Sequence, residues 1–124
     1  MYISVIKIYP PPGCEKAVID ILDTLKGPVA ASTDSLGCTV ALEGDERSEG
    51  KAVCYTERWR TREALDGHLR SPLYGRLLEA MECSCKEPEV EFYEATDVGG
   101  LELVEKARTT KKPAPGEIQE RGKV

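Results

Sequence analysis

The chain's single histidine is the clearest candidate for acid–base chemistry. His68 lies in a segment whose apolar residues Ala64, Leu65 and Leu69 recur at helical spacing. An imidazole titrates near physiological pH, so it can take up and return a proton during a reaction. A histidine on the apolar face of a helix can equally be a packing residue whose ring bonds to a backbone carbonyl. The sequence therefore offers one candidate base, with a structural role as the alternative.

Three residues of one predicted strand could act together with this histidine. Tyr55, Glu57 and Trp59 share a face because strand side chains alternate with period two. Trp59, the single tryptophan, suits either the wall of a pocket for a planar molecule or a core anchor. If Trp59 lines a pocket, Tyr55 and Glu57 line it too, and the Glu57 carboxylate would orient His68 or accept a substrate proton. In the opposite phase the intervening residues face the ligand and Glu57 forms an interface ion pair.

Tyr74 is a further candidate for substrate binding. It follows Ser71-Pro72 on a predicted helix and could donate a phenolic hydrogen bond to a substrate oxygen. Aromatic residues on the apolar stripe of a helix usually belong to the core, and we favour that interpretation.

The cysteines do not form a metal-binding pattern. Five are present, and Cys83-Ser84-Cys85 is their closest spacing. Structural zinc needs four Cys or His ligands, and no second ligand pair stands at a suitable distance along the sequence. Residues 1–7 show no export leader. We therefore expect free thiols in a reducing cytoplasm and no bound metal.

The candidate residues sit within a regular alternation of predicted elements. Helical stripes span residues 14–26, which Gly27-Pro28 should end, and 64–81, in which Ser71 and Pro72 should begin a fresh helix. Residues 44–50 form a polar hairpin loop. Strands are predicted over residues 2–9, 36–43, 51–60 and 89–97. The order β-α-β-β-α-β predicts an α+β ferredoxin-like sandwich, four antiparallel strands with two helices on one face.

Both faces of the predicted sheet are partly apolar. In the first strand Ile6 and Ile8 lie on one face, while Ile3, Val5 and Tyr9 lie on the other. A sheet covered by helices on one side and by water on the other should alternate more cleanly. We therefore expect the second face to be covered, and predict a homodimer that packs sheet to sheet.

Composition excludes several classes of protein. The chain has 124 residues and a net charge of −5, which disfavours nucleic-acid binding. Its longest uncharged stretch, residues 35–42, is far shorter than the roughly 20 residues of a membrane span. Residues 105–124 hold six basic and three acidic groups, whereas residues 1–104 carry −8. We predict a domain over residues 1–98 and a C-terminal extension over 99–124, which after the short apolar segment 101–104 is basic and mobile.

The segment Tyr55–Met81 resembles the antibiotic biosynthesis monooxygenase (ABM) domain, whose relatives include quinol monooxygenases. The similarity rests on Glu57-x-Trp59, residues 63–65, His68-Leu69 and residues 71–74. Element order and length extend it over about residues 1–98. The resemblance implies a dimeric α+β barrel, a pocket in each subunit for a flat aromatic or quinol-like molecule, and no metal, flavin or haem as prosthetic group.

The resemblance also implies a reaction. His68 would remove a proton from a hydroquinone or phenolic polyketide, and the resulting anion would reduce oxygen directly, between walls formed by Trp59 and Tyr55. Haem-degrading relatives use an asparagine on the first strand, and this chain contains no asparagine. Two alternatives remain open: a non-catalytic dimeric domain that binds a small ligand, and an isomerase of a small carbonyl compound on the same scaffold.

Overall fold

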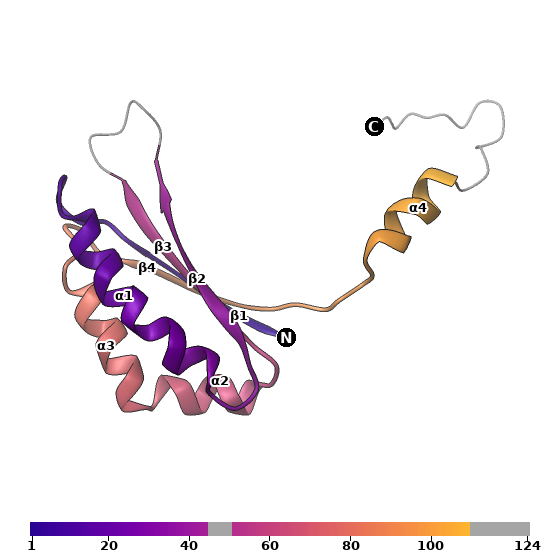
Figure 1. The fold of residues 1–124 in the computed structure, drawn as a ribbon, viewed down its shortest axis with the longest axis horizontal. Helices are drawn as coiled ribbons and strands as arrows, with labels where there is room; N and C mark the ends of the chain where they lie inside the picture. Colours follow the sequence, from indigo (N-terminus) through magenta and orange to yellow (C-terminus); the bar gives the residue numbers. More distant parts are fainter. Residues whose placement is uncertain (45–50, 110–124) are drawn as a thin grey trace.

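The computed structural model describes residues 1–44 and 51–109 and shows a four-stranded antiparallel sheet with helices on one face (Figure 1). The strands lie in the order β2-β3-β1-β4. They span Tyr2–Ile8 (β1), Ser35–Glu43 (β2), Ala52–Trp59 (β3) and Glu89–Glu94 (β4). Helices α1 (Glu15–Ala30), α2 (Arg62–Leu69) and α3 (Pro72–Met81) lie on one face of the sheet and leave β4 uncovered. This arrangement confirms the predicted α+β ferredoxin-like sandwich, with the second helical region divided in two.

The register of the central strands decides which residues face the helices. β1 pairs with β3 so that Ser4 lies opposite Glu57 and Ile6 opposite Tyr55. All four of these residues are fully buried. The phase that the sequence left open therefore places Tyr55, Glu57 and Trp59 under the helices.

The core fills the space between this sheet face and the helices. β1 and β3 contribute Ile6, Ile8 and Val53, which are fully buried. Helix α1 contributes residues at helical spacing, Val18, Leu22, Leu25 and Val29. Each fully buried aliphatic side chain stabilises the fold by about 1.5–3 kcal/mol, so this layer holds the helices against the sheet.

Helix α1 is longer than predicted. It runs through Gly27-Pro28 to Ala30, with Pro28 inside its last turn. Proline lacks one backbone hydrogen bond there, but burial of Val29 retains the final turn. At the start of α1 the buried side of the helix is narrower than predicted, because Cys14 and Ala17 are exposed.

The second helical region begins and restarts at capping residues. The Thr61 hydroxyl accepts a hydrogen bond from the Ala64 amide at 3.1 Å, which begins α2. The Ser71 hydroxyl accepts a hydrogen bond from the Tyr74 amide at 3.4 Å, and Pro72 opens α3. The predicted fresh start at Ser71-Pro72 is thus confirmed.

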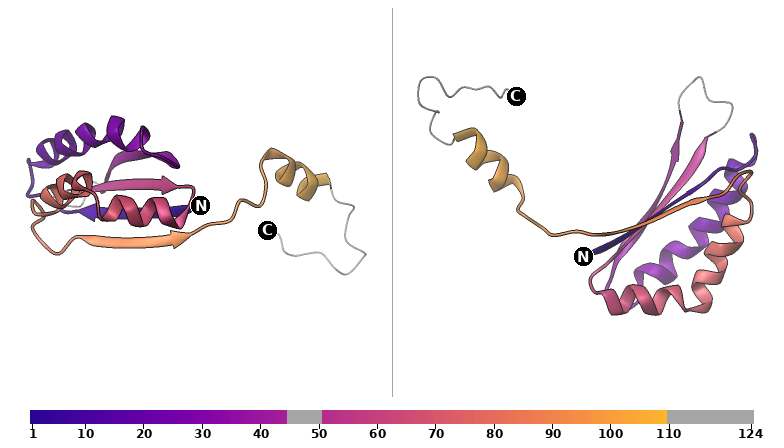
Figure 2. Two further views of the ribbon diagram at one scale, coloured as in Figure 1. Left: turned by 90° about the horizontal axis from the view of Figure 1, so that it is seen from below. Right: turned by 180° about the vertical axis from the view of Figure 1, so that it is seen from behind.

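The C-terminal extension differs from its prediction. Residues expected to be a short apolar segment and the start of a mobile tail form helix α4 (Leu101–Thr109). Every residue of α4 is exposed, and the helix stands away from the sandwich (Figure 2). Residues 110–124 of the predicted tail, and residues 45–50 of the predicted hairpin loop, lie outside the described part of the chain.

The sheet face opposite the helices is partly apolar, as the strand alternation predicted. Ile3 and Val5 of β1 and Ala52 and Cys54 of β3 lie there, all half-buried. Among the described helices, none combines the length and the apolar character needed to cross a membrane.

Candidate active site

Glu57 is the centre of a buried hydrogen-bond network. Its carboxylate is fully buried and accepts hydrogen bonds from the Tyr55 hydroxyl at 2.7 Å and from the Trp59 indole at 3.0 Å. The third partner is His68 Nε2, 2.8 Å from Glu57 Oε2. A buried carboxylate needs such donors, because it has lost its hydration. Strand β3 supplies three members of the network, and α2 brings the fourth over the sheet.

The network determines which nitrogen of His68 carries a proton. A carboxylate can only accept hydrogen bonds, so Nε2 must donate to Glu57. The neutral ring then carries its lone pair on Nδ1. Within the described residues no hydrogen bond engages Nδ1, and His68 lines an open pocket. Nδ1 is therefore the ring nitrogen left to accept a hydrogen bond or a proton, while Glu57 orients the ring.

Aromatic rings hold the imidazole from two sides. The Trp59 ring lies 4.8 Å from the His68 ring between centroids, tilted by 33°. The Tyr74 ring meets His68 edge-on at 5.4 Å. The Ser71 hydroxyl also donates to the His68 carbonyl at 2.7 Å, which ties the end of α2 to the start of α3. These contacts restrict the ring to one orientation.

The pocket beside His68 has a volume of about 570 Å³. Trp59 and His68 form its inner part, and the junction of α2 and α3 forms one side with Ser71, Pro72 and Leu73. The loop between α1 and β2 forms the opposite side. This volume is within the range of pockets for small organic molecules.

The structure divides the predicted site residues into two groups. Trp59 and His68 line the pocket. Tyr55, Glu57 and Tyr74 share the network or its aromatic packing but do not line it. Tyr55 and Glu57 share the strand face of Trp59, as predicted, but lie deeper than Trp59, which stands at the end of β3. Tyr74 is buried in the core, the role that its helical position favoured.

Sequence reasoning missed the polar loop that closes the pocket. Ser32, Thr33 and Asp34 line it between α1 and β2. Asp34 has a backbone φ of +61°, in the left-handed region that residues other than glycine seldom adopt. Its carbonyl accepts a hydrogen bond from the Arg60 amide at 2.8 Å. The run of polar residues between a helix and a strand was the available signal for such a loop.

Ser4 is a second residue that sequence reasoning missed. It is fully buried, opposite Glu57 in the β1–β3 ladder. Among the buried side-chain polar atoms of the described residues, its Oγ stands alone without a hydrogen-bond partner. An unpaired buried hydroxyl is costly, which makes Ser4 a sensitive probe of this region.

Electrostatics keep the neighbouring phenols neutral. Burial, followed by the nearby Glu57 carboxylate, raises the pKa of Tyr55 far above its ordinary value. The same two causes raise the pKa of Tyr74. Burial also raises the pKa of the Cys38 thiol, which lies opposite Glu57 on β2. Tyr55 therefore acts as a hydrogen-bond donor to Glu57 and not as an acid.

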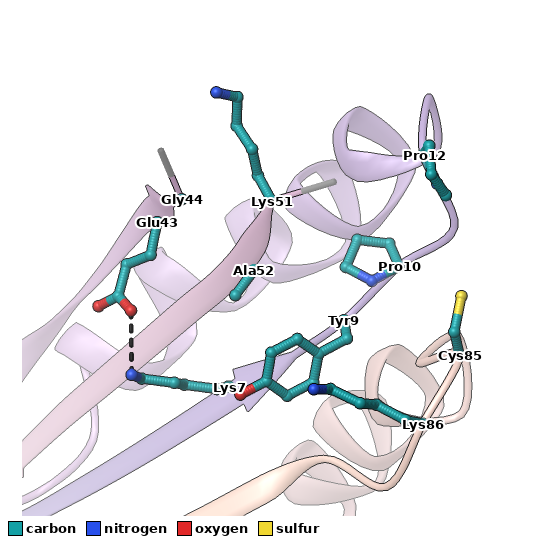
Figure 3. A pocket seen from close by; sticks show the side chains of 10 residues that line it. All are labelled: Lys7, Tyr9, Pro10, Pro12, Glu43, Gly44, Lys51, Ala52, Cys85 and Lys86. Atoms are coloured by element: carbon teal, nitrogen blue, oxygen red, sulfur yellow. Dashed lines mark ion pairs between the residues drawn. The ribbon is translucent and has the colours of Figure 1, made fainter. Parts of the chain in front are cut away.

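A second hollow lies at the other end of the β2–β3 hairpin, with a volume of about 620 Å³ (Figure 3). Lys7 pairs there with Glu43 at 3.0 Å, and the Lys86 ammonium lies 4.1 Å from the centre of the Tyr9 ring. Lys51 points away from that ion pair (Figure 3). Cys85 borders this hollow, so it is remote from His68. Among residues 1–44 and 51–109 no group of three or more metal-ligating side chains is suitably arranged to hold an ion.

Comparison with known folds gives many similar structures. Rv0793 from Mycobacterium tuberculosis is 24% identical, with a TM-score of 0.65, and the match covers 81% of this chain and 100% of that one. A protein from Deinococcus radiodurans, named for antibiotic biosynthesis monooxygenase, is 17% identical with a TM-score of 0.64, covering 81% and 97%. A protein of the same name from Caulobacter crescentus is 18% identical with a TM-score of 0.61, covering 77% and 90%. At these low sequence identities, the structural similarity establishes the fold alone.

Sequence comparison identifies the family. No curated protein matches the chain. The family model described as antibiotic biosynthesis monooxygenase matches residues 1–80, which is more than half of the chain and contains the whole Glu57–His68 network. The chain therefore belongs to the antibiotic biosynthesis monooxygenase family.

Proposed function

We propose that this protein is a monooxygenase that needs no prosthetic group and oxidises a small aromatic, quinol-like substrate with O₂. The observation that carries the proposal is the orientation of His68. Its Nε2 is held by Glu57 at 2.8 Å, which leaves Nδ1 as the ring nitrogen that would accept a proton, and His68 borders the pocket. A positioned imidazole is the commonest general base in enzymes.

The proposed reaction begins with proton transfer from the substrate to His68 Nδ1. The electron-rich anion that remains can pass electrons directly to O₂. For a hydroquinone, one atom of O₂ becomes a hydroxyl oxygen on a ring carbon that carried hydrogen, and the other leaves as water with two of the substrate's hydrogens, so that hydroquinone and O₂ give a hydroxyquinone and water. His68 returns the proton that it took up in the first step. The imidazolium formed in the first step is stabilised by Glu57, whose carboxylate already lies within hydrogen-bond distance.

The surroundings of the pocket support chemistry on a planar substrate. Trp59 borders the pocket, although most of its ring is buried against the core. Pro72 and Leu73 add further apolar surface. A planar substrate that covers these apolar residues would displace water from the pocket and strengthen the electrostatic interactions there.

The proposal includes a homodimer that packs sheet to sheet in the cytoplasm. Its support is the half-buried apolar row on the uncovered sheet face, with Ile3, Val5 and Cys54. A second copy would remove this row from water. Equilibrium sedimentation of the purified chain tests it, and a monomer at all accessible concentrations contradicts it.

An isomerase is the second candidate, because a base at Nδ1 also suits proton abstraction next to a carbonyl. The deciding experiment is oxygen consumption by metal-stripped protein with a panel of hydroquinones and phenolic polyketides, with His68→Ala as control. Uptake that His68→Ala abolishes supports the monooxygenase. Uptake that survives the substitution contradicts the assignment of the base, and no uptake contradicts the proposed activity.

A further inference from the structure

The C-terminal extension carries an apolar surface with nothing of its own chain against it. Residues 95–109, called the arm below, run on from β4 away from the sandwich and end in α4 (Figure 2). Large apolar side chains of the arm are strongly exposed, with Val98 at 76%, Leu101 at 70% and Val104 at 52%. A contiguous exposed apolar surface of this kind is typical of an interaction site.

Helix α4 is amphipathic. At 100° per residue Leu101, Leu103, Val104 and Ala107 fall on one side of the helix, together with Arg108. The opposite side carries only polar residues, Glu102, Glu105, Lys106 and Thr109. The helix has nine residues, and isolated helices shorter than about 12–15 residues are marginal in water. Its helical state therefore needs a surface to pack against.

Specific hydrogen bonds fix the direction in which the arm leaves the sandwich. The Met1 carbonyl accepts the Ala95 amide at 2.8 Å, which continues the β1–β4 ladder by one step. Asp97 then accepts the Gly99 amide at 2.9 Å, and Glu102 accepts the Gly100 amide at 2.7 Å. Gly99 has φ +141°, which a residue with a side chain rarely adopts. The arm is thus directed outward by specific contacts.

A matching surface lies between α2 and β4. This groove has a volume of about 270 Å³, and its apolar part is formed by Tyr2, Leu65, Leu69 and Phe92. Phe92 is 47% exposed although it faces the helix side of the sheet, because no helix covers β4. Arg62, Asp66 and Glu94 border this apolar part of the groove, and the last turn of α4 contains Lys106 and Arg108. The groove and the arm therefore each present apolar side chains with charged residues beside them.

We propose that the arm docks into the α2–β4 groove of a second copy of this chain, and that the exchange is reciprocal. Glu94, the last residue of β4, lines the groove. The arm that follows it runs away from the sandwich (Figure 2), so it would have to reverse direction to fill the groove of its own chain. A second copy related by a two-fold axis receives the arm without a reversal and returns its own, giving two identical junctions. The inference does not depend on the proposed oxygenase activity.

Photo-cross-linking tests the contact directly. The full chain carrying Val104→p-benzoylphenylalanine should give a dimer-mass band after irradiation, with the cross-linked peptide containing Leu69 or Phe92. The same probe at Thr109, on the polar side of α4, should cross-link much less. Monomer-mass cross-links within one chain, cross-links to another surface, or no cross-link at Val104 would each overturn the proposal.

A mixing experiment separates exchange between copies from docking within one chain. Val104→Asp damages the arm, and Phe92→Asp damages the groove at an exposed position. We expect each variant alone to raise the dimer Kd at least about tenfold, because both junctions are lost. A mixture of the two should recover part of the affinity, since one heterodimer junction joins an intact arm to an intact groove. No recovery on mixing, with both variants folded by circular dichroism, would refute exchange.

Discussion

Replacing Glu57 by glutamine tests the central network most sharply. The carboxylate accepts three hydrogen bonds, from Tyr55 at 2.7 Å and His68 at 2.8 Å on Oε2 and from Trp59 at 3.0 Å on Oε1. An amide of the same shape has one accepting oxygen and one donating nitrogen. Glu57→Gln must therefore place its NH₂ group against at least one of these donors.

Both orientations of the amide are unfavourable. If the amide oxygen keeps the hydrogen bonds from Tyr55 and His68, the Trp59 N–H faces an NH₂ group and loses its acceptor. An unpaired donor in a buried site costs about 1–3 kcal/mol. If its oxygen keeps Trp59, His68 must accept at Nε2 and carry its proton on Nδ1. Nδ1 would then be a donor, and His68 could no longer serve as the base of the proposed reaction.

The measurement follows from the same geometry. Trp59 is the single tryptophan and bonds to Glu57, so its fluorescence reports urea-induced unfolding from within the network. We expect Glu57→Gln to lower the free energy of unfolding by about 1–3 kcal/mol. If the proposed function holds, oxygen uptake should fall by about 10²–10⁴-fold, the usual contribution of a general base. Glu79→Gln makes the same chemical change at an exposed helix position and should alter neither quantity.

One pair of results would refute the reasoning. If the free energy of unfolding of Glu57→Gln lies within about 0.5 kcal/mol of that of the unaltered protein, a difference typical of neutral surface substitutions, the buried network does not stabilise the fold. If it also retains full oxygen uptake, Glu57 does not orient His68.

Three further predictions follow from the buried groups. Because burial raises the pKa of Tyr55, only the unfolded chain ionises it above pH of about 10, so the free energy of unfolding falls there by about 1.4 kcal/mol per pH unit for this group. Tyr55→Phe should make that fall shallower in urea titrations from pH 9 to 11.5, and an unchanged slope would contradict the assignment. Burial raises the pKa of Cys38 and Cys54, so a thiol reagent at pH 8 should label the three exposed cysteines first. Equal rates at all five would be the contrary result. Ser4→Ala removes a buried hydroxyl without a partner and should leave the free energy of unfolding unchanged or raise it by up to about 1 kcal/mol. A clear loss in denaturation would show that Ser4 is bonded after all.

Much of the fold was readable from local patterns. Alternation along residues 2–9 and 51–60 predicted two strands with apolar residues on both faces, and both were found. Ser71 and Pro72 predicted a helix start because capping depends on neighbouring residues only. The same local reasoning misplaced the end of α1, where burial of Val29 outweighs the missing hydrogen bond of Pro28.

Helix α4 shows another limit of local patterns. Four residues at its start looked like a short apolar segment after Gly99-Gly100, yet the helix continues to Thr109. A short helix with no buried residue gives a weak periodic signal, since no core selects one side of it.

What the sequence by itself determined is the order of the elements, the shared face of Tyr55, Glu57 and Trp59, and the single candidate base, His68. Only the tertiary structure decided that this face lies under the helices and that Glu57 holds His68 Nε2. Periodicity relates residues within one element, whereas this contact joins a strand to a helix 11 residues further along. Its existence depends on the strand register and on how α2 packs over β3, and both are settled by burial of the whole core.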